Sequence, residues 1–234
     1  MINSVRQTVL GLLNKNNFGY IGPFDFNQFA KQAQMELFEE YFVRYNAAIN
    51  AENARQSGTG YAGSSLPLQE VIDSFSVTEP LVYDVDQGGY DLTTLTNTPY
   101  ELNRIAYVGS NYEAENIPPY KINLLVASPL TSPSLSFPAF VQQGTTIAMY
   151  PATEQDISVT YLRYPKDPQW TFIDLQQGEP LFNESATDYQ DFELPIEDEY
   201  RLIQKICQYC GLSIRETEVI QYAKNEENET MAKG

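Results

Sequence analysis

The sequence contains no histidine, and that absence removes much of ordinary enzyme chemistry. Histidine is the most common general base near neutral pH and the most common protein ligand of metal ions. A Ser-His-Asp or Cys-His catalytic arrangement is therefore impossible within this chain. The glycine patterns that bind nucleotide phosphates are missing as well. We accordingly expect no catalytic, cofactor-binding or metal-binding residues, no cofactor and no enzyme activity.

Cysteine is nearly absent too. The two cysteines, Cys207 and Cys210, have the spacing of a redox motif or of half a zinc site. Neither a second cysteine pair nor a histidine is present to complete a tetrahedral site. Both thiols fall on or beside the apolar face of a predicted helix. We expect small buried core residues, with redox chemistry as the alternative, and the sequence leaves their redox state open.

Lysine and arginine are scarce: the chain carries 14 of them against 31 Asp and Glu, a formal net charge of −17. Residues 66–195 hold four basic and eighteen acidic residues, so the acidity lies in the middle of the chain. Binding of nucleic acid in a groove needs basic side chains that displace counterions, and this composition argues against it. The acidic middle fits a solvated surface, a basic partner, or a wall past which DNA slides without adhering.

Long hydrophobic runs are missing. Near the start only the short stretch Val9–Leu13 is apolar, which is too short for a secretory signal. No other stretch approaches the length of a membrane span. We expect a protein that is made and kept in a cytoplasm and that has no membrane partner.

The sequence does contain one long amphipathic stretch, residues 24–56. Its apolar side chains recur at steps of three and four residues, which predicts a continuous helix much longer than the usual one of about 11–12 residues. Gly22-Pro23 separates this helix from the segment before it, and Asp25 can cap the helix. Further helices are predicted at 3–14, at 67–75, at 197–210 between Pro195 and Gly211, and at 213–227.

The part between these helices has the alternation of strands. Residues 157–164 alternate apolar and polar side chains, which predicts a strand with one buried face. Gln143-Gly144 predicts a tight hairpin turn. Residues 118–127 fit a strand or a helix equally, and the prolines between 129 and 138 predict an extended or looped arm. Strands are predicted at 76–86, 102–108, 139–142, 145–150 and 157–164.

Helices at both ends and strands between them predict an α+β fold. We expect a helical bundle built from the N- and C-terminal helices, residues 1–65 and 196–234, with an inserted antiparallel β region over residues 66–195. A connector rich in Gly and Ser, residues 57–65, precedes the insertion.

Two functional alternatives follow from residue chemistry. Glu113 with Glu115, or Asp188 with Asp191, lie in predicted loops where a carboxylate pair could act as a hydrolase. The aromatic residues of the segment 161–170 suggest a β-rich tail or receptor-binding module that contacts carbohydrate. The other interpretation of that segment is a strand end whose Tyr and Trp side chains seal the β layer.

Short segments spread along nearly the whole chain carry a family resemblance. They are Leu12-Leu13-Asn14-Lys15, Gly19-Tyr20-Ile21, 26–34, Ala127-Ser128-Pro129-Leu130-Thr131, Met149-Tyr150-Pro151, 157–170 and Gly211-Leu212-Ser213-Ile214-Arg215-Glu216. In this order they resemble structural proteins of tailed phages that infect Bacteroidetes. Taken together they are similar to a ring protein, the head-to-tail adaptor, of crAss-like phages.

This resemblance implies a structural virion protein of the neck or tail, assembled in the cytoplasm of the bacterial host. It implies a closed ring of twelve copies between portal and tail, through which DNA passes without specific binding. The partners would be further copies of the chain, the portal protein and the next tail or ring protein. Adaptors of this family are helical bundles with an inserted β region, and the family supplies no catalytic residues.

Contacts between subunits would then carry the function. We expect them in the Pro-rich arm 130–140, whose apolar side chains have no obvious local core, and in the last predicted helix. The alternative is that these residues cover the core of their own subunit. The expected contact residues are Leu135, Phe137, Phe140, Ile214, Val219, Ile220 and Tyr222.

Overall fold

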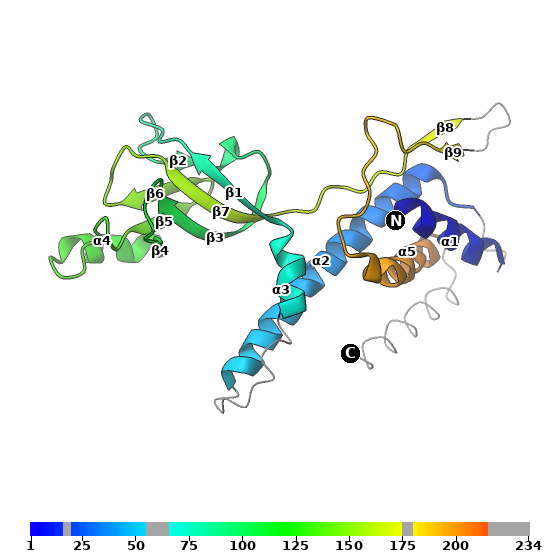
Figure 1. The fold of residues 1–234 in the computed structure, drawn as a ribbon, viewed down its shortest axis with the longest axis horizontal. Coiled ribbons are helices and arrows are strands. Elements are labelled where there is room, and N and C mark those ends of the chain that lie inside the picture. Colours follow the sequence, from blue (N-terminus) through cyan, green and yellow to red (C-terminus); the bar gives the residue numbers. More distant parts are fainter. Residues whose placement is uncertain (16–19, 55–65, 175–179, 215–234) are drawn as a thin grey trace. The chain divides into compact units, whose positions relative to one another are not determined.

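The computed structural model describes residues 1–15, 20–54, 66–174 and 180–214, and it confirms the α+β class. The chain divides into two compact units (Figure 1). The helical unit consists of Met1–Val71 and Pro165–Gly234, and the β unit consists of Ile72–Tyr164. The predicted connector 57–65 and the predicted helix beyond Ile214 lie outside the described residues.

The helical unit is built around α2 (Pro23–Ala54), the long helix that the apolar spacing predicts. Proline at its first position costs nothing because the N–H there has no partner within a helix, and Asp25 lies in the favourable first turn. Helix α5 (Glu199–Ile214) packs against α2, and α1 (Ile2–Lys15) packs against α5. The short 3-10 helix η2 (Ile196–Asp198) leads into α5.

The core of this unit comes from both ends of the chain. Each helix contributes buried residues at helical spacing, and they include Ile2, Val5, Val9 and Leu13 of α1, Phe26, Ala33, Leu37 and Phe38 of α2, and Leu202, Ile206 and Cys210 of α5. The prediction that Cys207 and Cys210 are buried is confirmed, and both are free thiols. The prediction that the helix at 197–210 ends at Gly211 is wrong: Gly211 is buried, and α5 continues past it to Ile214.

Two amide side chains on α2 hold the segment that follows the β unit. The Asn27 side chain accepts from the N–H of Trp170 at 2.9 Å and donates to its carbonyl at 3.2 Å. Further along the helix, Gln34 donates to the Lys166 carbonyl at 2.7 Å and accepts from the N–H of Glu193 at 3.0 Å. These bonds satisfy backbone groups that no strand or helix partner serves.

Charged residues join α2 to α5. The Lys205 ammonium is almost fully buried and lies 2.7 Å from Glu40 and 3.0 Å from Glu36. Arg201 pairs with Glu40 and, at 3.2 Å, with the buried Asp198. Each buried charge has an opposite charge beside it, and this attraction offsets the cost of removing the charges from water. Removing one partner would leave the other buried charge uncompensated and would destabilise the unit.

The segment after the β unit forms a small ribbon of its own. Strands β8 (Phe172–Asp174) and β9 (Pro180–Phe182) pair antiparallel, and they were not predicted because three-residue strands give almost no periodic signal. Trp170 stacks with both Phe172 and Phe182, and the Arg6 guanidinium lies 3.8 Å from the centre of the Trp170 ring. The ribbon and the residues around it belong to the helical unit.

The unit boundaries differ from the predicted insertion of residues 66–195. The compact β unit begins at Ile72, within α3 (Leu66–Asp73), and ends at Tyr164. Residues 165–195 are assigned to the helical unit because Asn27 and Gln34 fasten them to α2. Composition alone groups them with the acidic middle.

Two sheets form the β unit. Strands β1 (Ser76–Leu81), β7 (Ile157–Arg163) and β3 (Pro99–Tyr107) form an antiparallel sheet in the order β1-β7-β3. The second sheet has the order β2-β6-β5-β4, from β2 (Tyr90–Asp91), β6 (Thr146–Tyr150), β5 (Ala139–Gln143) and β4 (Glu115–Asn116). A 3-10 turn, η1 (Leu92–Thr94), follows β2.

The predicted one-sided burial of the strand at 157–164 is confirmed over residues 157–161, but Leu162, on the opposite face, is buried as well at 3% exposure. Ile157, Val159 and Tyr161 are fully buried in the core that both sheets share. The predicted hairpin turn forms one residue later than expected, at Gly144-Thr145, because Gln143 still pairs with Thr146. Gly144 has a φ of +62°, a conformation that glycine adopts without strain. The first predicted strand, 76–86, is shorter than expected and ends at Leu81.

A short segment ties the two sheets together. Ala114 donates to the carbonyl of Ile105 in β3 at 2.8 Å, and Glu115 donates to the carbonyl of Pro138 at 2.9 Å. The segment therefore bridges from β3 to β5, with which β4 pairs parallel. The ambiguous stretch 118–127 follows at once and is a helix, α4 (Pro119–Ala127), packed on the outer face of β5.

Replacing Gln34 with Leu should destabilise the helical unit by about 2–4 kcal/mol, because the Lys166 carbonyl and the Glu193 N–H lose their partner. Urea unfolding followed by the fluorescence of Trp170, the one tryptophan, measures this directly. Gln32→Leu, at an exposed position of the same helix, is the control and should shift the midpoint little. Equal stability of the two variants would contradict the role of Gln34.

Asp191 should make the helical unit more stable above pH 4 than below it. Burial acts to raise the pKa of its carboxyl, but hydrogen bonds from the Met1 amino group, Ile2 and Phe192 outweigh burial and lower that pKa. A lowered folded pKa gives stability that is complete above the ordinary value near 4 and is lost as the pH falls through the folded value. The difference in unfolding midpoint between wild type and Asp191→Asn should therefore shrink between about pH 5 and pH 3. A constant difference would contradict this assignment.

Candidate assembly surface

The β unit presents apolar side chains around α4 that its own core leaves uncovered. The inner face of α4 buries Ile122 against Ala139 and Val141 of β5, with Leu125 partly buried beside them. The outer face carries Tyr120 and Leu124, each 74% exposed. Two large apolar residues four positions apart form one stripe on a helix, so this exposed stripe is continuous.

The Pro-rich arm after α4 carries further exposed apolar side chains. Residues 128–138 form turns, held by the Ser128 carbonyl, which accepts from Thr131 and Ser132, and by mutual bonds between Ser134 and Phe137. Leu130 is 97% exposed and Phe137 79% exposed. Exposed apolar residues that occur singly are ordinary, but a group of them in one region is typical of a binding surface.

Between the arm and β4 lies a cleft of about 430 Å³. Its apolar side is formed by Leu125, Leu130, Phe137 and neighbouring prolines of the arm, and its acidic side by Glu113 and Glu115. Glu113 lies 4.0 Å from the Arg104 guanidinium, whereas the Glu115 carboxylate has no ion pair or hydrogen bond within the described ranges. The cleft therefore combines an apolar floor with an available negative charge.

The predicted contact residues have different positions in the structure. Leu135 is 54% exposed and lies with Phe137 on the arm. Phe140 is not available for contacts: it is 5% exposed and belongs to the core between the two sheets. It lies in β5, where alternate residues face opposite sides, so Phe140 points into that core while Ala139 and Val141 lie under α4.

The C-terminal part of the predicted surface is largely outside the described residues. Ile214 is the last residue of α5, and its side chain is not among those described. Val219, Ile220 and Tyr222 lie beyond the described ranges. Sequence reasoning missed Tyr120 and Leu124 because residues 118–127 fit a strand as well as a helix, so the sequence did not indicate which side of this segment is left uncovered.

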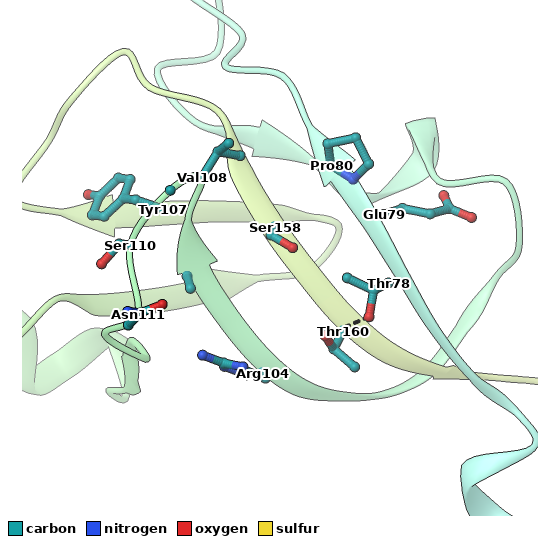
Figure 2. A pocket seen from close by; sticks show the side chains of 12 residues that line it. Thr78, Glu79, Pro80, Arg104, Tyr107, Val108, Ser110, Asn111, Ser158 and Thr160 are labelled. Carbon is teal, nitrogen blue, oxygen red and sulfur yellow. Dashed lines mark hydrogen bonds between the residues drawn. The ribbon is translucent and has the colours of Figure 1, made fainter.

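A second surface of the β unit is a polar groove of about 590 Å³ on the outer face of the β1-β7-β3 sheet (Figure 2). Thr78 and Thr160 meet in its middle with their hydroxyl oxygens 2.9 Å apart, and Ser158 lies beside them. Arg104 lines one side, while Glu79 turns to the core side of the sheet, where Tyr161 donates to it at 3.3 Å. The groove contains no exposed aromatic ring on which a sugar could stack among the described residues that line it, since Tyr107 is buried.

The aromatic segment that suggested carbohydrate contacts has another role. Trp170 is 2% exposed, donates to the Asn3 side chain at 3.1 Å and lies in the helical unit. The interpretation of the sequence in which Trp170 seals the β layer is therefore wrong. Tyr161 does lie in the β core.

Asp191, one of the loop acids considered for hydrolysis, accepts backbone hydrogen bonds from Ile2 and Phe192.

The acidity of residues 66–195 is divided between the two units. The β unit, residues 72–164, carries ten acidic and three basic residues. Residues 165–195 carry seven acidic residues and one basic residue, and they belong to the helical unit. The negative charge is therefore a property of both units.

The exposed Phe137 and the buried Phe140 give a matched test of this surface. Phe140→Ala should destabilise the β unit by about 3–5 kcal/mol because it opens a cavity between the sheets. Phe137→Ala should change the free energy of unfolding by less than about 0.5 kcal/mol. Urea unfolding followed by tyrosine circular dichroism measures both, and a comparable loss in Phe137→Ala would show that the arm is part of the core.

Membrane spans and metal clusters are missing from the described part of the chain. None of the described helices is both long enough and apolar enough to pass through a bilayer. No group of three or more Cys, Asp or Glu side chains in the described ranges is arranged to hold a metal ion.

A scan against protein-family models finds no match to this chain, and a search of curated proteins finds none either.

Proposed function

We propose that this chain is a structural subunit of a ring-shaped head-to-tail adaptor in a tailed bacteriophage. In this proposal twelve copies form a closed ring between the portal protein and the next tail or ring protein. The ring belongs to the neck of the virion, assembles in the host cytoplasm and has no enzymatic role. The proposal starts from the resemblance of the sequence segments to adaptors of crAss-like phages.

The observation that best supports the proposal is the uncovered apolar surface of the β unit. Tyr120, Leu124, Leu130 and Phe137 are all more than 70% exposed, and they come from one helix and the arm that follows it. A monomer that keeps such a group in water has an unfavourable surface, which association with another protein surface would remove. An associative role needs such a surface and needs no reactive group.

The fold also suits a ring subunit. Helices from both ends of the chain close one core, and the β unit is inserted between them as a separate compact body. A closed ring requires that one surface of each copy complements a different surface of the next copy. A chain with two compact bodies has several distinct surfaces that can meet this requirement.

The net charge of −17 fits a DNA conduit. Carboxylates that face a bore repel the phosphate backbone, so DNA passes along such a wall without being held. In this proposal part of the acidity of both units lines that bore. Averaged images of tail complexes that place these carboxylates on the outside of the ring would remove this part of the proposal.

The double substitution Leu130→Ser with Phe137→Ser should abolish ring formation while leaving the fold intact, because both side chains are exposed. Negative-stain images and sedimentation velocity, with the protein alone and mixed with portal protein, measure assembly. Ile173→Ser, an exposed apolar position in the β8–β9 ribbon, is the control and should still assemble.

The wild-type protein decides the proposal itself. Rings in either condition, and density for this chain in the neck of purified particles, are the expected results. A wild-type chain that forms no ring with portal protein and is missing from the neck would overturn the proposed function. A double variant that assembles like wild type would instead show that the contacts lie elsewhere.

A further inference from the structure

Helix α4 is apolar around most of its circumference, yet only one side of it is covered. Ile122 and Leu125 pack toward β5, whereas Tyr120 and Leu124 face solvent. A helix that is apolar on all sides is normally buried on all sides. The outer stripe of α4 therefore has the composition of an element that a second protein surface covers.

A basic side chain that is available for an ion pair lies beside this stripe. The other two basic residues of the β unit are already engaged. Arg104 lies near Glu113. The guanidinium of Arg163 lies 5.6 Å from the centre of the Phe75 ring and donates to the Tyr164 carbonyl. Lys121 is exposed next to Tyr120 and forms no ion pair within the described part of the chain. The stripe is thus apolar with one available positive charge.

The cleft beside β4 has the complementary composition. Leu130 and Phe137 supply exposed apolar surface, and the Glu115 carboxylate is available on the opposite wall. Its volume of about 430 Å³ lies in the range that accommodates a few large side chains. No basic residue is among the described residues that line it, so a cation that enters the cleft meets only negative charge.

We propose that α4 of one copy docks into this cleft on the next copy, with Tyr120 and Leu124 on the apolar floor and Lys121 paired with Glu115. A second copy is the occupant because stripe and cleft complement each other in both apolar surface and charge. The β unit has only three basic residues against ten acidic ones, so most other approaches of two copies bring like charges together. This inference rests on the proposed ring and names the contact that would build it.

The contact is heterologous: two different surfaces of the same chain meet, and each copy keeps one of each for its other neighbour. Repetition of such a contact produces a ring when the rotation closes. The charge pair gives the contact its register, and the apolar stripe gives it most of its affinity.

Charge reversal separates this contact from others. Lys121→Glu and Glu115→Arg should each raise the concentration needed for half-maximal assembly by at least about tenfold, because each places like charges in the contact. Both positions are exposed, so the thermal unfolding of each variant should match that of wild type. Sedimentation velocity, with portal protein present if wild type requires it, measures the assembly.

Mixing the two variants in equal amounts is the decisive step. In an alternating assembly, the contacts are of two kinds. In one kind the arginine introduced at position 115 faces the glutamate introduced at position 121, and in the other the unchanged Glu115 faces the unchanged Lys121. Every contact is then complementary, and the mixture should assemble within about threefold of the wild-type concentration. A Lys121–Glu115 pair formed inside one chain would gain nothing from mixing.

Glu154→Arg is the matched control for the change in net charge, since Glu154 is exposed in the same unit but outside the cleft. It should assemble like wild type. Single variants that assemble like wild type, or a mixture that stays unassembled, would overturn the docking contact and leave the ring proposal standing. A wild-type chain that forms no ring even with portal protein would overturn both.

Discussion

The helical unit depends on two amide side chains, Asn27 and Gln34, that serve the backbone of residues 165–195. They lie about two turns apart along α2, and each both donates to and accepts from that segment. Buried backbone groups need partners, and a segment without regular structure has none of its own. Because α2 supplies them, the chain returns from the β unit along this helix and places α5 against it, so that α1, α2 and α5 share one core.

In the β unit, the bridge between the two sheets plays the corresponding role. Ala114 and Glu115 use their N–H groups in opposite directions, one toward β3 and one toward the residue before β5. The chain must then leave the sheets at Ile117, and α4 covers the outer face of β5. This path explains why β5 is buried on both faces and why the arm after α4, which has no strand left to pair with, lies at the surface.

The periodic parts of the fold could be predicted from the sequence, because their signal is local. The long helix α2 and the alternating strand β7 follow from spacing alone. The position of residues 165–195 in the helical unit could not be predicted from the sequence. Asn27 and Gln34, which hold this segment, look like ordinary polar residues of a helix, and their partners are more than 130 residues away. The prediction for Phe140 is wrong for a related reason: the strand that contains it is predicted, but the side chains that bury it come from distant strands.

The small number of basic residues explains why apolar surface has to dominate any association of this chain with itself. Lys205 is buried between α2 and α5, and Arg201, half-buried, pairs with Glu40 and Asp198. Lys31 pairs with Asp167 at 2.6 Å, and Arg104 lies near Glu113. Internal pairing therefore uses much of the positive charge of the described residues, and two copies approach each other mainly with negative charge. Burial of the exposed apolar side chains of α4 and the arm has to outweigh that repulsion, while the few remaining cations determine where contact is tolerated. In such a chain, affinity and position of a contact come from different residues, so they can be tested by separate substitutions.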